Sequence, residues 1–306
     1  MRNAPVSERP PVGLFVGLAT LDVVHRVEAP PGPNEKITAA TQFVAAGGPA
    51  ANAAVAFAAL GGTAVLVTAL GDDAVAGIIR ADLQAYGVQV TDAAAGTRRA
   101  VPVSSVTVVE ATGDRSVVSL DAVNSEAEPP PDLDTLVADA DVLLVDGHHP
   151  LLARAAVRAA AARSLPCVVD AGRWKPVMAD LSASATDMVC SNDFRTPGAD
   201  SGPATAAALI DGGVDTVVTT AGGEPVQWWS GGQTGTVPVP SVTVVDTLGA
   251  GDVFHGAYCY HRTDPEIETA ERVERAAGLA SLRCSVVGPR AWLNDLYPQP
   301  TGRRPQ

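Results

Sequence analysis

Residues 245–257 combine small residues and a carboxylate in an order that could carry out phosphoryl transfer. They read Val-Asp-Thr-Leu-Gly-Ala-Gly-Asp-Val-Phe-His-Gly-Ala, which predicts a strand, a tight turn and then a helix. The start of such a helix offers unpaired N–H groups and the positive end of a dipole, and so binds anions. A carboxylate beside an anion site weakens binding, because like charges repel. Asp252 is useful there if it accepts the proton of a hydroxyl that attacks a phosphoryl group held by those N–H groups.

A structural role is the alternative for these residues. Asp and Gly are common in turns and at the starts of helices. A short Gly-x-Gly pattern is therefore structural more often than not. The longer string Asp-Thr-x-Gly-Ala-Gly-Asp, at residues 246–252, is much more specific than its parts.

A second pair of glycines lies at residues 47–52, which read Gly-Gly-Pro-Ala-Ala-Asn. An alanine-rich segment follows, so the structural interpretation is a Gly-rich turn into a core helix. The functional interpretation places Asn52 in the first turns of that helix, where Gly47 and Gly48 let a ligand approach the backbone closely. By itself this pattern is weak.

His148 and His149 are adjacent in the chain. Neighbouring residues of a strand point to opposite faces, so a metal site built from both is not indicated. We expect them in a loop after a strand that ends at Val145; the alternative is one histidine lining a pocket at the carboxyl end of that strand. The sequence has no G-x-x-x-x-G-K-[ST] phosphate loop, no G-x-G-x-x-G after its first strand and no G-x-S-x-G.

The composition sets broad limits on function. The 306 residues suit one large α/β domain or two small ones, and the net charge of −13 argues against nucleic acids and anionic membranes as partners. No run reaches the ~18 apolar residues of a membrane span, and Met1 to Pro11 lacks the apolar core of a signal peptide. The four cysteines form no C-x-x-C pair, so neither a zinc site nor a redox dithiol is indicated. We expect a cytoplasmic protein with reduced thiols.

Strand-like and helix-like runs alternate along most of the chain. This alternation predicts a three-layer α/β/α fold with a central, mostly parallel sheet. Short apolar runs predict strands at residues 12–18, 63–70, 142–145, 167–170, 188–191, 216–220 and 226–230, with a tight turn at 230–233. Helices are expected in the alanine-rich segment that ends at residue 60 and at residues 74–86, 150–164, 203–211, 250–260 and 265–284.

Residues 98–121 break this rhythm. Two β-branched runs, at 103–110 and 116–121, flank a turn at 111–114 and predict an antiparallel hairpin outside the parallel sheet. Residues 20–41 are expected to be irregular, because the prolines at 30, 31 and 33 break any helix. Part of residues 20–45 could join the hairpin to form a lid over the site.

The string at residues 246–252 resembles the C-terminal signature of the ribokinase-like (PfkB) family of sugar and nucleoside kinases. Residues 47–52 resemble its N-terminal signature, Gly-Gly-x-x-x-Asn, and the two stand in the family's order and separation. The resemblance implies one kinase domain over residues 1–306, with lid segments at about 20–45 and 98–121. Within the family, both motifs look closer to bacterial members related to ketohexokinase and sulfofructose kinase.

The resemblance also implies a role for each matching residue. Asp252 would be the general base, and the N–H groups of Gly249, Ala250 and Gly251 would form the anion hole. The residues implied to hold the sugar are Asp22, Gly47, Gly48 and Asn52. The residues implied to bind ATP, which comes with Mg²⁺, are Asn192, Thr220, Gly222, Thr247, Gly249, Gly251 and Gly288. Asp246 and Ser285 match positions linked to a monovalent cation, such as K⁺.

The chain departs from the family pattern in two places. Many members carry Asn-x-x-Glu, which is linked to Mg²⁺ and phosphate, whereas residues 192–195 read Asn-Asp-Phe-Arg, with Arg195 in place of the glutamate. The ribose-type Gly-Gly-Lys-Gly-x-Asn is Gly-Gly-Pro-Ala-Ala-Asn here, which lowers the expectation for ribose itself. Arg98, Arg115 or Arg173 could meet an anionic substituent of the substrate, although each is more often an exposed surface arginine.

Three functions stay open on this basis. The first is an ATP-dependent sugar kinase, the second a nucleoside kinase of the adenosine type, and the third a non-catalytic sugar or nucleotide sensor on the same fold. The hairpin at 98–121 has no aromatic side chain to stack on a base, which favours a sugar, whose identity stays open. An intact Gly-Ala-Gly-Asp favours an enzyme, because a sensor needs no base. The resemblance also allows a homodimer formed through the lids.

Overall fold

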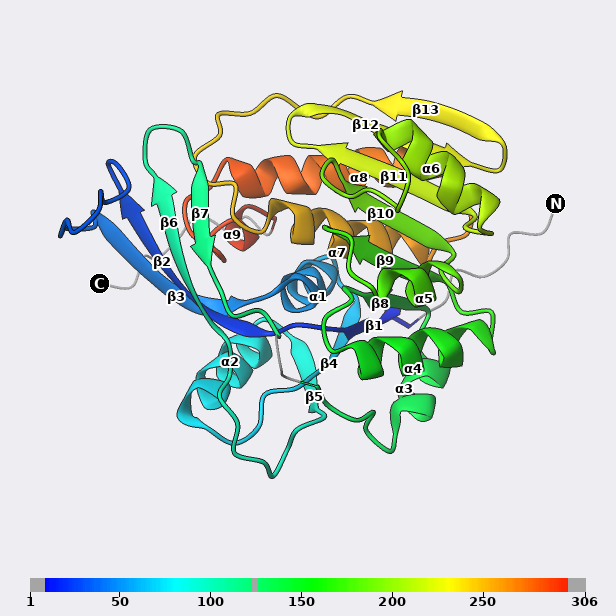
Figure 1. Cartoon of the computed structure of the whole chain (residues 1–306), viewed down its shortest axis with the longest axis horizontal. Coiled ribbons are helices and arrows are strands. Elements are labelled where there is room, and N and C mark those ends of the chain that lie inside the picture. The colour runs from blue at the N-terminus through cyan, green and yellow to red at the C-terminus, as the bar shows by residue number, and fades with distance from the viewer. Residues whose placement is uncertain (1–8, 123–125, 297–306) are drawn as a thin grey trace.

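The computed structural model of the chain describes residues 9–122 and 126–296 (Figure 1). Met1 to Pro11, which was expected to lack a signal peptide, lies outside this range in its first eight residues. A nine-stranded sheet has the order β13-β12-β11-β10-β9-β8-β1-β4-β5, with parallel pairing from β11 to β5 and antiparallel pairing of β12 and β13. Its strands are β1 (Val12–Val16), β4 (Thr63–Thr68), β5 (Val88–Asp92), β8 (Val142–Val145), β9 (Cys167–Ala171), β10 (Asp187–Ser191), β11 (Thr216–Ala221), β12 (Glu224–Ser230) and β13 (Gln233–Val237).

Helices cover both faces of this sheet, so a central strand such as β8 is a continuous apolar run. Side chains alternate along each strand: Phe15 of β1 packs into one core, and Leu14 and Val16 pack into the other. The first core is covered by α1 (Pro49–Ala59), α2 (Ala74–Ala85), α7 (Ala250–Arg262) and α8 (Thr269–Cys284), and the second by α3 (Leu133–Asp139), α4 (Pro150–Ala161), α5 (Met178–Ser182) and α6 (Gly202–Asp211); the short α9 (Leu293–Leu296) follows α8. The predicted three-layer α/β/α fold is confirmed. Among the described residues, no helix has the length and apolar character needed to cross a bilayer.

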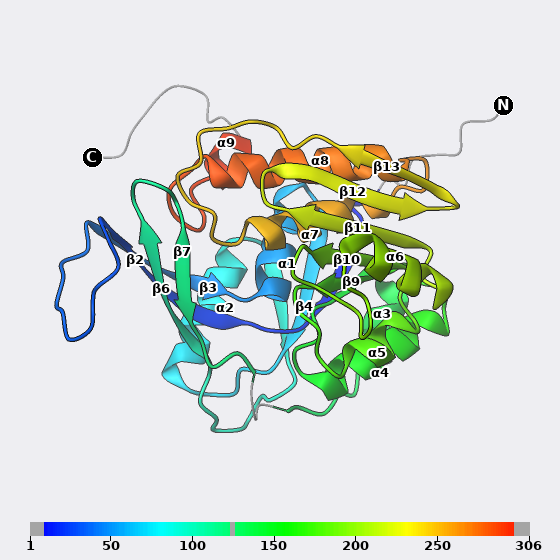
Figure 2. The same ribbon diagram turned by 45° about the horizontal axis from the view of Figure 1, so that its top comes forward.

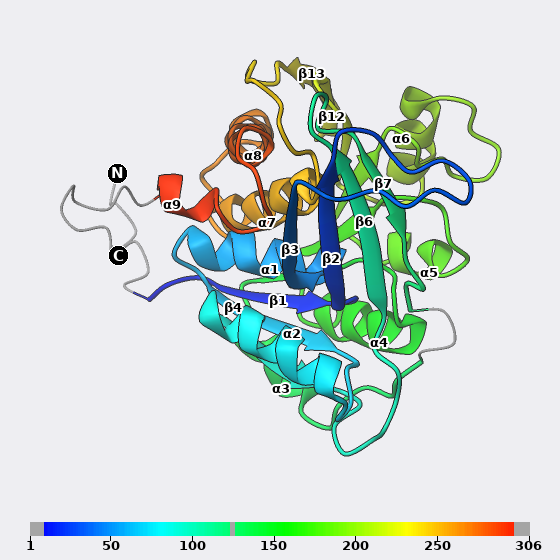
Figure 3. The same ribbon diagram turned by 90° about the vertical axis from the view of Figure 1, so that its left-hand side faces the viewer.

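A separate four-stranded sheet, which we call the small sheet, lies beside the large one (Figure 3). Its strands, in the order β3-β2-β6-β7, are β2 (Thr20–Val27), β3 (Thr41–Gly47), β6 (Val103–Val109) and β7 (Arg115–Val118). Val24, Val106 and Val108 form its buried face, and Phe43 and Leu248 pack against them. Leu248 belongs to the turn before α7, so the small sheet rests on that turn.

The hairpin predicted at residues 98–121 is confirmed as β6 and β7. The prediction of irregular structure over residues 20–41 is wrong, because β2 occupies its first eight residues and pairs with both β3 and β6. The prolines at 30, 31 and 33 follow this strand and do not interrupt it. Asp22 and Arg26 are buried polar residues within β2, so a search for apolar alternation could not find the strand.

The short elements β5, β13, α3 and α5 were also not predicted from the sequence. Each has only five to seven residues. A run this short does not establish a hydrophobic period, and its conformation depends on the neighbours that it packs against.

The close contact between α1 and α7 gives a first prediction. A Cβ on Gly256 of α7 would lie 2.2 Å from the carbonyl oxygen of Ala53 in α1. Replacing Gly256 with alanine should therefore lower the free energy of unfolding by about 1–3 kcal/mol, measured by chemical denaturation. Gly278→Ala in α8 is the matched control, because a Cβ there meets nothing within 4 Å. It should leave stability unchanged or raise it by up to about 1 kcal/mol. Equal effects of the two variants would contradict this account.

Candidate active site

The turn before α7 is shaped by a glycine and a buried carboxylate. Gly249 precedes the helix with a φ of 73°, a left-handed conformation that suits glycine. Asp246 is 1% exposed, and its Oδ1 accepts the N–H of Leu248 (3.0 Å). The helix begins at Ala250, as predicted, and Asp252 lies in its first turn. The carboxylate therefore lies at the N-terminal end of α7, where the first N–H groups of a helix have no partner within the helix.

Asp252 is joined to a chain of polar side chains from distant segments. Asn52 donates through Nδ2 to Oδ2 of Asp252 (2.8 Å) and accepts at Oδ1 from Nη1 of Arg290 (3.0 Å). Nη2 of Arg290 donates to the carbonyl of Ala46 (2.7 Å) and to Oδ2 of Asp82 (3.2 Å). Asn52 and Asp252 are thus brought together as the motifs predicted. Arg290 and Asp82 were not predicted from the sequence.

Asp22 and the glycine pair meet as the resemblance implied. A Cβ on Gly47 would lie 2.0 Å from Oδ2 of Asp22, so only glycine fits beside this carboxylate. Gly48 has a φ of 98°, and a Cβ there would lie 2.4 Å from the carbonyl oxygen of Leu18. The glycines therefore permit a close approach between β3, the start of α1 and the Asp22 side chain.

The environment of Asp22 changes its acidity. The residue is 8% exposed, and burial is the main cause that raises its pKa from 3.8 to about 6. A hydrogen bond with Ser104 opposes this shift, the negative charge of Asp252 adds to it, and Arg290 opposes it. Asp22 and Asp252 are thus close enough to influence each other.

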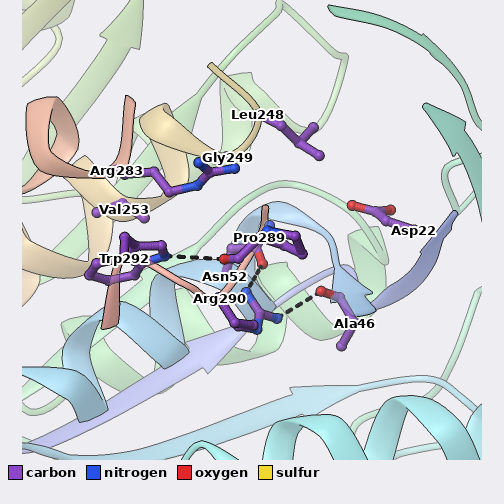
Figure 4. Close-up of a pocket in the computed structure, with 10 residues that line it drawn as sticks. All are labelled: Asp22, Ala46, Asn52, Leu248, Gly249, Val253, Arg283, Pro289, Arg290 and Trp292. Atoms are coloured by element: carbon purple, nitrogen blue, oxygen red, sulfur yellow. Dashed lines mark hydrogen bonds between the residues drawn. The ribbon is translucent and has the colours of Figure 1, made fainter. Parts of the chain in front are cut away.

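A pocket lies between these groups (Figure 4). It is lined by Asp22, Ala46, Asn52, Leu248, Gly249, Val253, Arg283, Pro289, Arg290 and Trp292. Three of these residues, Asp22, Asn52 and Gly249, were predicted from the motifs. Arg283 and Arg290 flank Ser285 and Gly288, which had been singled out, and their charge in an otherwise small-residue and apolar stretch was the available signal.

The small sheet holds the other side of the turn (Figure 2). The carbonyl of Gly113, at the tip of the β6–β7 hairpin, accepts from Oγ1 of Thr247 (3.0 Å). Arg115 donates to the same hydroxyl (3.1 Å), and Arg26 of β2 donates to the carbonyl of Val245 (2.9 Å). The hairpin tip therefore lies against the predicted anion site.

The other two candidate arginines lie elsewhere. Nη2 of Arg173 is 3.7 Å from Oδ2 of Asp121. Arg98 lines a second cavity together with Asp72, Asp73, Ala74, Arg99 and Ala100. Of the three arginines considered from the sequence, Arg115 is the one that contacts the turn before α7.

The residues expected on the nucleotide side lie at adjacent strand ends. Thr220 of β11 pairs in register with Ser191 of β10, and Asn192 follows directly. Gly222 follows β11 in a left-handed conformation, with a φ of 60°. Arg195, which stands where the family has glutamate, donates to the carbonyls of Asn192 (2.7 Å) and Phe194 (2.7 Å). The arginine thus fastens the loop after β10.

Asp246 is paired with an arginine. Nη2 of Arg283 lies 3.1 Å from Oδ2 of Asp246, and both side chains are about 2% exposed. The same Oδ2 accepts the N–H of Gly288 (3.0 Å), whose φ is 95°. The hydroxyl of Ser285 donates instead to the carbonyl of Leu282 (2.8 Å). The structure therefore places Asp246 and Gly288 together, and the cation beside Asp246 is a guanidinium.

The two adjacent histidines lie in the loop between β8 and α4, as predicted. Nδ1 of His148 is 3.1 Å from Oδ1 of Asp146, and Lys175 lies 3.0 Å from the other ring nitrogen. Asp146 also accepts the N–H groups of Leu18 (2.9 Å) and Ala50 (3.2 Å). Burial opposes its ionisation, but His148, Lys175 and the N–H of Leu18 outweigh burial and lower the pKa of Asp146. The Asp146 carboxylate therefore holds the start of α1 through the N–H of Ala50.

A buried histidine of α7 contacts the backbone of the first turn of the same helix. Nδ1 of His255 lies 2.6 Å from the carbonyl oxygen of Gly251, and its Nε2 lies 3.4 Å from Oδ1 of Asp170. Burial raises the pKa of Asp170 to about 6, against the effect of His255 and with a contribution from Asp252. Neither His255 nor Asp170 was predicted as a site residue, because each lies within an apolar run.

The chain is similar to known proteins over most of its length. Residues 14–295 match the family model described as pfkB family carbohydrate kinase. A deoxyribokinase of Salmonella typhi is 24% identical over 278 residues, which cover 83% of this chain and 87% of the relative. A ribokinase of Bacillus subtilis is 26% identical over 284 residues, which cover 87% and 91% of the two chains.

Solved structures show the same fold. A ribokinase-like protein from Agrobacterium tumefaciens superposes with a TM-score of 0.83 at 26% identity and covers 94% of this chain and 96% of its own. A ribokinase from Arabidopsis thaliana, solved with ribose and ATP, superposes with a TM-score of 0.75 at 23% identity and covers 94% and 99%.

Proposed function

Because the chain belongs to the pfkB family of carbohydrate kinases, we propose that it transfers the γ-phosphoryl group of ATP to a hydroxyl of a small sugar. One observation carries the proposal: the Asp252 carboxylate lies in the first turn of α7 and is held by Asn52 at 2.8 Å, next to a pocket that contains Asp22. A base, an anion site and hydroxyl-binding groups are what this reaction needs.

Each group has a part in the proposed reaction. Asp252 accepts the proton of the sugar hydroxyl while the hydroxyl oxygen forms a bond to the γ-phosphorus of ATP. The bond between the γ-phosphorus and the β–γ bridging oxygen breaks, and ADP is released. The N–H groups of Gly249, Ala250 and Gly251 stabilise the charge on the phosphoryl oxygens. The N–H of Ala250 meets the carbonyl of Thr247 over 3.3 Å, a long bond that an anion could replace.

The sugar is proposed to bind Asp22 and Asn52, whose carboxylate and amide suit hydroxyl groups. Gly47 and Gly48 leave room for it beside the backbone. The small sheet is proposed to act as a lid that keeps water from competing with the sugar as acceptor. Its contact with Thr247 supports this role, because it places the hairpin tip at the anion site.

ATP is proposed to lie along Asn192, Thr220, Gly222, Thr247 and Gly288. Mg²⁺ would come with the nucleotide, since it is usually bound by one or two carboxylates together with substrate phosphates. The exposed oxygen atoms of Asn192 and Asp193 fit such a role. In the described part of the chain, no group of three or more His, Cys, Asp or Glu side chains could hold a metal by itself. When bound, the ion would neutralise phosphate charge.

A substrate panel tests the proposal. ADP release with Mg-ATP would be measured for ribose, 2-deoxyribose, ribose 1-phosphate, fructose, 2-keto-3-deoxygluconate, sulfofructose, fructose phosphates and adenosine. The pentoses come first, because the similar proteins are named as a deoxyribokinase and ribokinases. Turnover of one sugar supports the proposal. Turnover of adenosine alone favours the nucleoside kinase, and binding of sugar and ATP without turnover favours the sensor.

The raised pKa of Asp22 predicts how sugar affinity depends on pH. With a pKa of about 6, Asp22 is ionised in roughly nine tenths of the molecules at pH 7 and one tenth at pH 5. If the carboxylate accepts sugar hydroxyls, the KM for the sugar should rise roughly tenfold from pH 7 to pH 5. Asp22→Asn should remove this dependence while raising KM at pH 7. A wild-type KM that is constant over this range would contradict the role of Asp22.

The raised pKa of Asp22 also makes the stability of the folded protein depend on pH. The folded state binds the Asp22 proton more tightly than the unfolded chain does, so Asp22 favours folding below its unfolded pKa of 3.8. This contribution is lost as the pH rises through about 6. Denaturation of Asp22→Asn at pH 7 should therefore show a more stable protein than the wild type.

Oligomeric state and location are also proposals. Val44, Val117 and Val118 of the small sheet are exposed apolar side chains, which supports a homodimer formed through this sheet; light scattering decides between dimer and monomer.

The four cysteines are free, which supports a reducing, cytoplasmic location.

A further inference from the structure

The guanidinium of Arg283 is buried among oxygen atoms beside the turn that precedes α7. Its Nη2 lies 3.1 Å from Oδ2 of Asp246. Its Nη1 donates to the carbonyl of Val286 (3.0 Å) and approaches the carbonyl of Asp246 (3.4 Å). Arg283 and Asp246 are each 1% exposed. A charge buried this deeply persists only when it is paired and hydrogen-bonded, and here both conditions hold.

The same oxygen atoms are of the kind that binds a metal cation. A carboxylate and backbone carbonyls are hard ligands, and Asp246 had been matched to a monovalent cation site together with Ser285. The residues do not fit that ion. Its place beside the carboxylate is taken by the guanidinium, and the Ser285 hydroxyl is bonded to the carbonyl of Leu282. A second cation on these oxygens would be repelled strongly, because buried charges are poorly screened.

We propose that Arg283 is a built-in cation that replaces a bound monovalent metal ion in this chain. The proposal rests on the kinase function proposed above. Arg283 holds Asp246, whose Oδ1 binds the N–H of Leu248 and whose Oδ2 binds the N–H of Gly288. These bonds set the turn at Gly249, and Arg283 is thus a positioning residue for the anion hole. The anion hole is then preset without an ion from solution.

Kinetics in different salts test the proposal. Activity on the best sugar of the panel would be measured in KCl, NaCl and tetramethylammonium chloride at equal ionic strength. Wild-type kcat and KM should agree within about twofold in all three salts. Arg283→Ala should lose at least tenfold of its activity in tetramethylammonium chloride and regain most of it in KCl or guanidinium chloride at non-denaturing concentration. A wild type that K⁺ activates severalfold would overturn the proposal.

Arg272→Ala is the matched control. Arg272 also lies in α8, is 6% exposed and pairs with a buried carboxylate, Asp187, at 3.6 Å, but it does not line the pocket. Its alanine variant should lose stability without any response to K⁺. An Arg283→Ala variant whose activity behaves in the same way would show that Arg283 is only structural and overturn the proposal.

Thermal unfolding gives a readout that does not need turnover. Raising KCl against tetramethylammonium chloride should raise the Tm of Arg283→Ala, because an ion that binds the folded state stabilises it. The Tm of the wild type and of Arg272→Ala should not respond. A wild-type Tm that rises with K⁺ specifically would overturn the proposal, even if no sugar of the panel were phosphorylated. If Arg283→Ala does not fold, the wild-type salt series still decides.

Discussion

Asp252→Asn is expected to lower kcat by about 100- to 10,000-fold while the affinities for sugar and ATP stay within a few-fold of the wild type. Asparagine has the shape of aspartate, and its oxygen can still accept the 2.8 Å hydrogen bond from Asn52. It cannot accept the proton of the sugar hydroxyl, so the chemical step alone should suffer. The measurements are ADP release under saturating conditions and binding of each ligand by calorimetry.

Asp73→Asn is a suitable control for this variant. Asp73 is the N-cap of α2, where its side chain accepts from the N–H of Ala76, and asparagine caps helices equally well. Its kcat should match that of the wild type. If Asp252→Asn kept more than a tenth of wild-type kcat, Asp252 would not be the general base, and another group would have to accept the proton.

The second large effect is expected at Gly251. Gly251→Pro removes one N–H from the proposed anion hole and should lower kcat by about 100- to 1000-fold. Proline is tolerated in the first turn of a helix, because the N–H that it lacks has no partner within the helix there. This chain already has a proline at the same place in another helix, since Pro203 is the second residue of α6. Stability should therefore change little.

Gly251→Ala is the matched variant, because it keeps the N–H. A Cβ at this position meets no protein atom within 4 Å. The proline variant should be at least tenfold slower than the alanine variant, and the ratio measures the N–H itself. Equal rates for the two would mean that the Gly251 N–H does not contact the phosphoryl group. Circular dichroism and thermal unfolding check that both variants fold.

Local rules explain which parts of the molecule were predictable. The bounds of β8 were predicted correctly because four consecutive apolar residues suit a strand buried on both faces. The start of α7 at Ala250 was predicted correctly because the small residues up to Gly249 indicate a tight turn directly before a helix. In contrast, β2 was missed because its buried Asp22 and Arg26 serve contacts with other segments. Its alternation was hidden by residues whose partners lie far away in the chain.

Residue types and spacing were enough to single out the candidate groups of the proposed site. Asp252 with the small residues before it, and Asn52 with the glycines before it, were identified from types and spacing alone, since a turn and the helix that follows it are set by neighbouring residues. The contacts of these groups depend on the tertiary structure. Asn52 meets Asp252, 200 residues away, and Arg290, 238 residues away. Asp246 had been matched to a metal site, but in the structure it pairs with Arg283. The packing of α8 against α7 places the guanidinium beside the Asp246 carboxylate. Such pairings depend on burial and charge balance across the whole fold, which no local pattern contains.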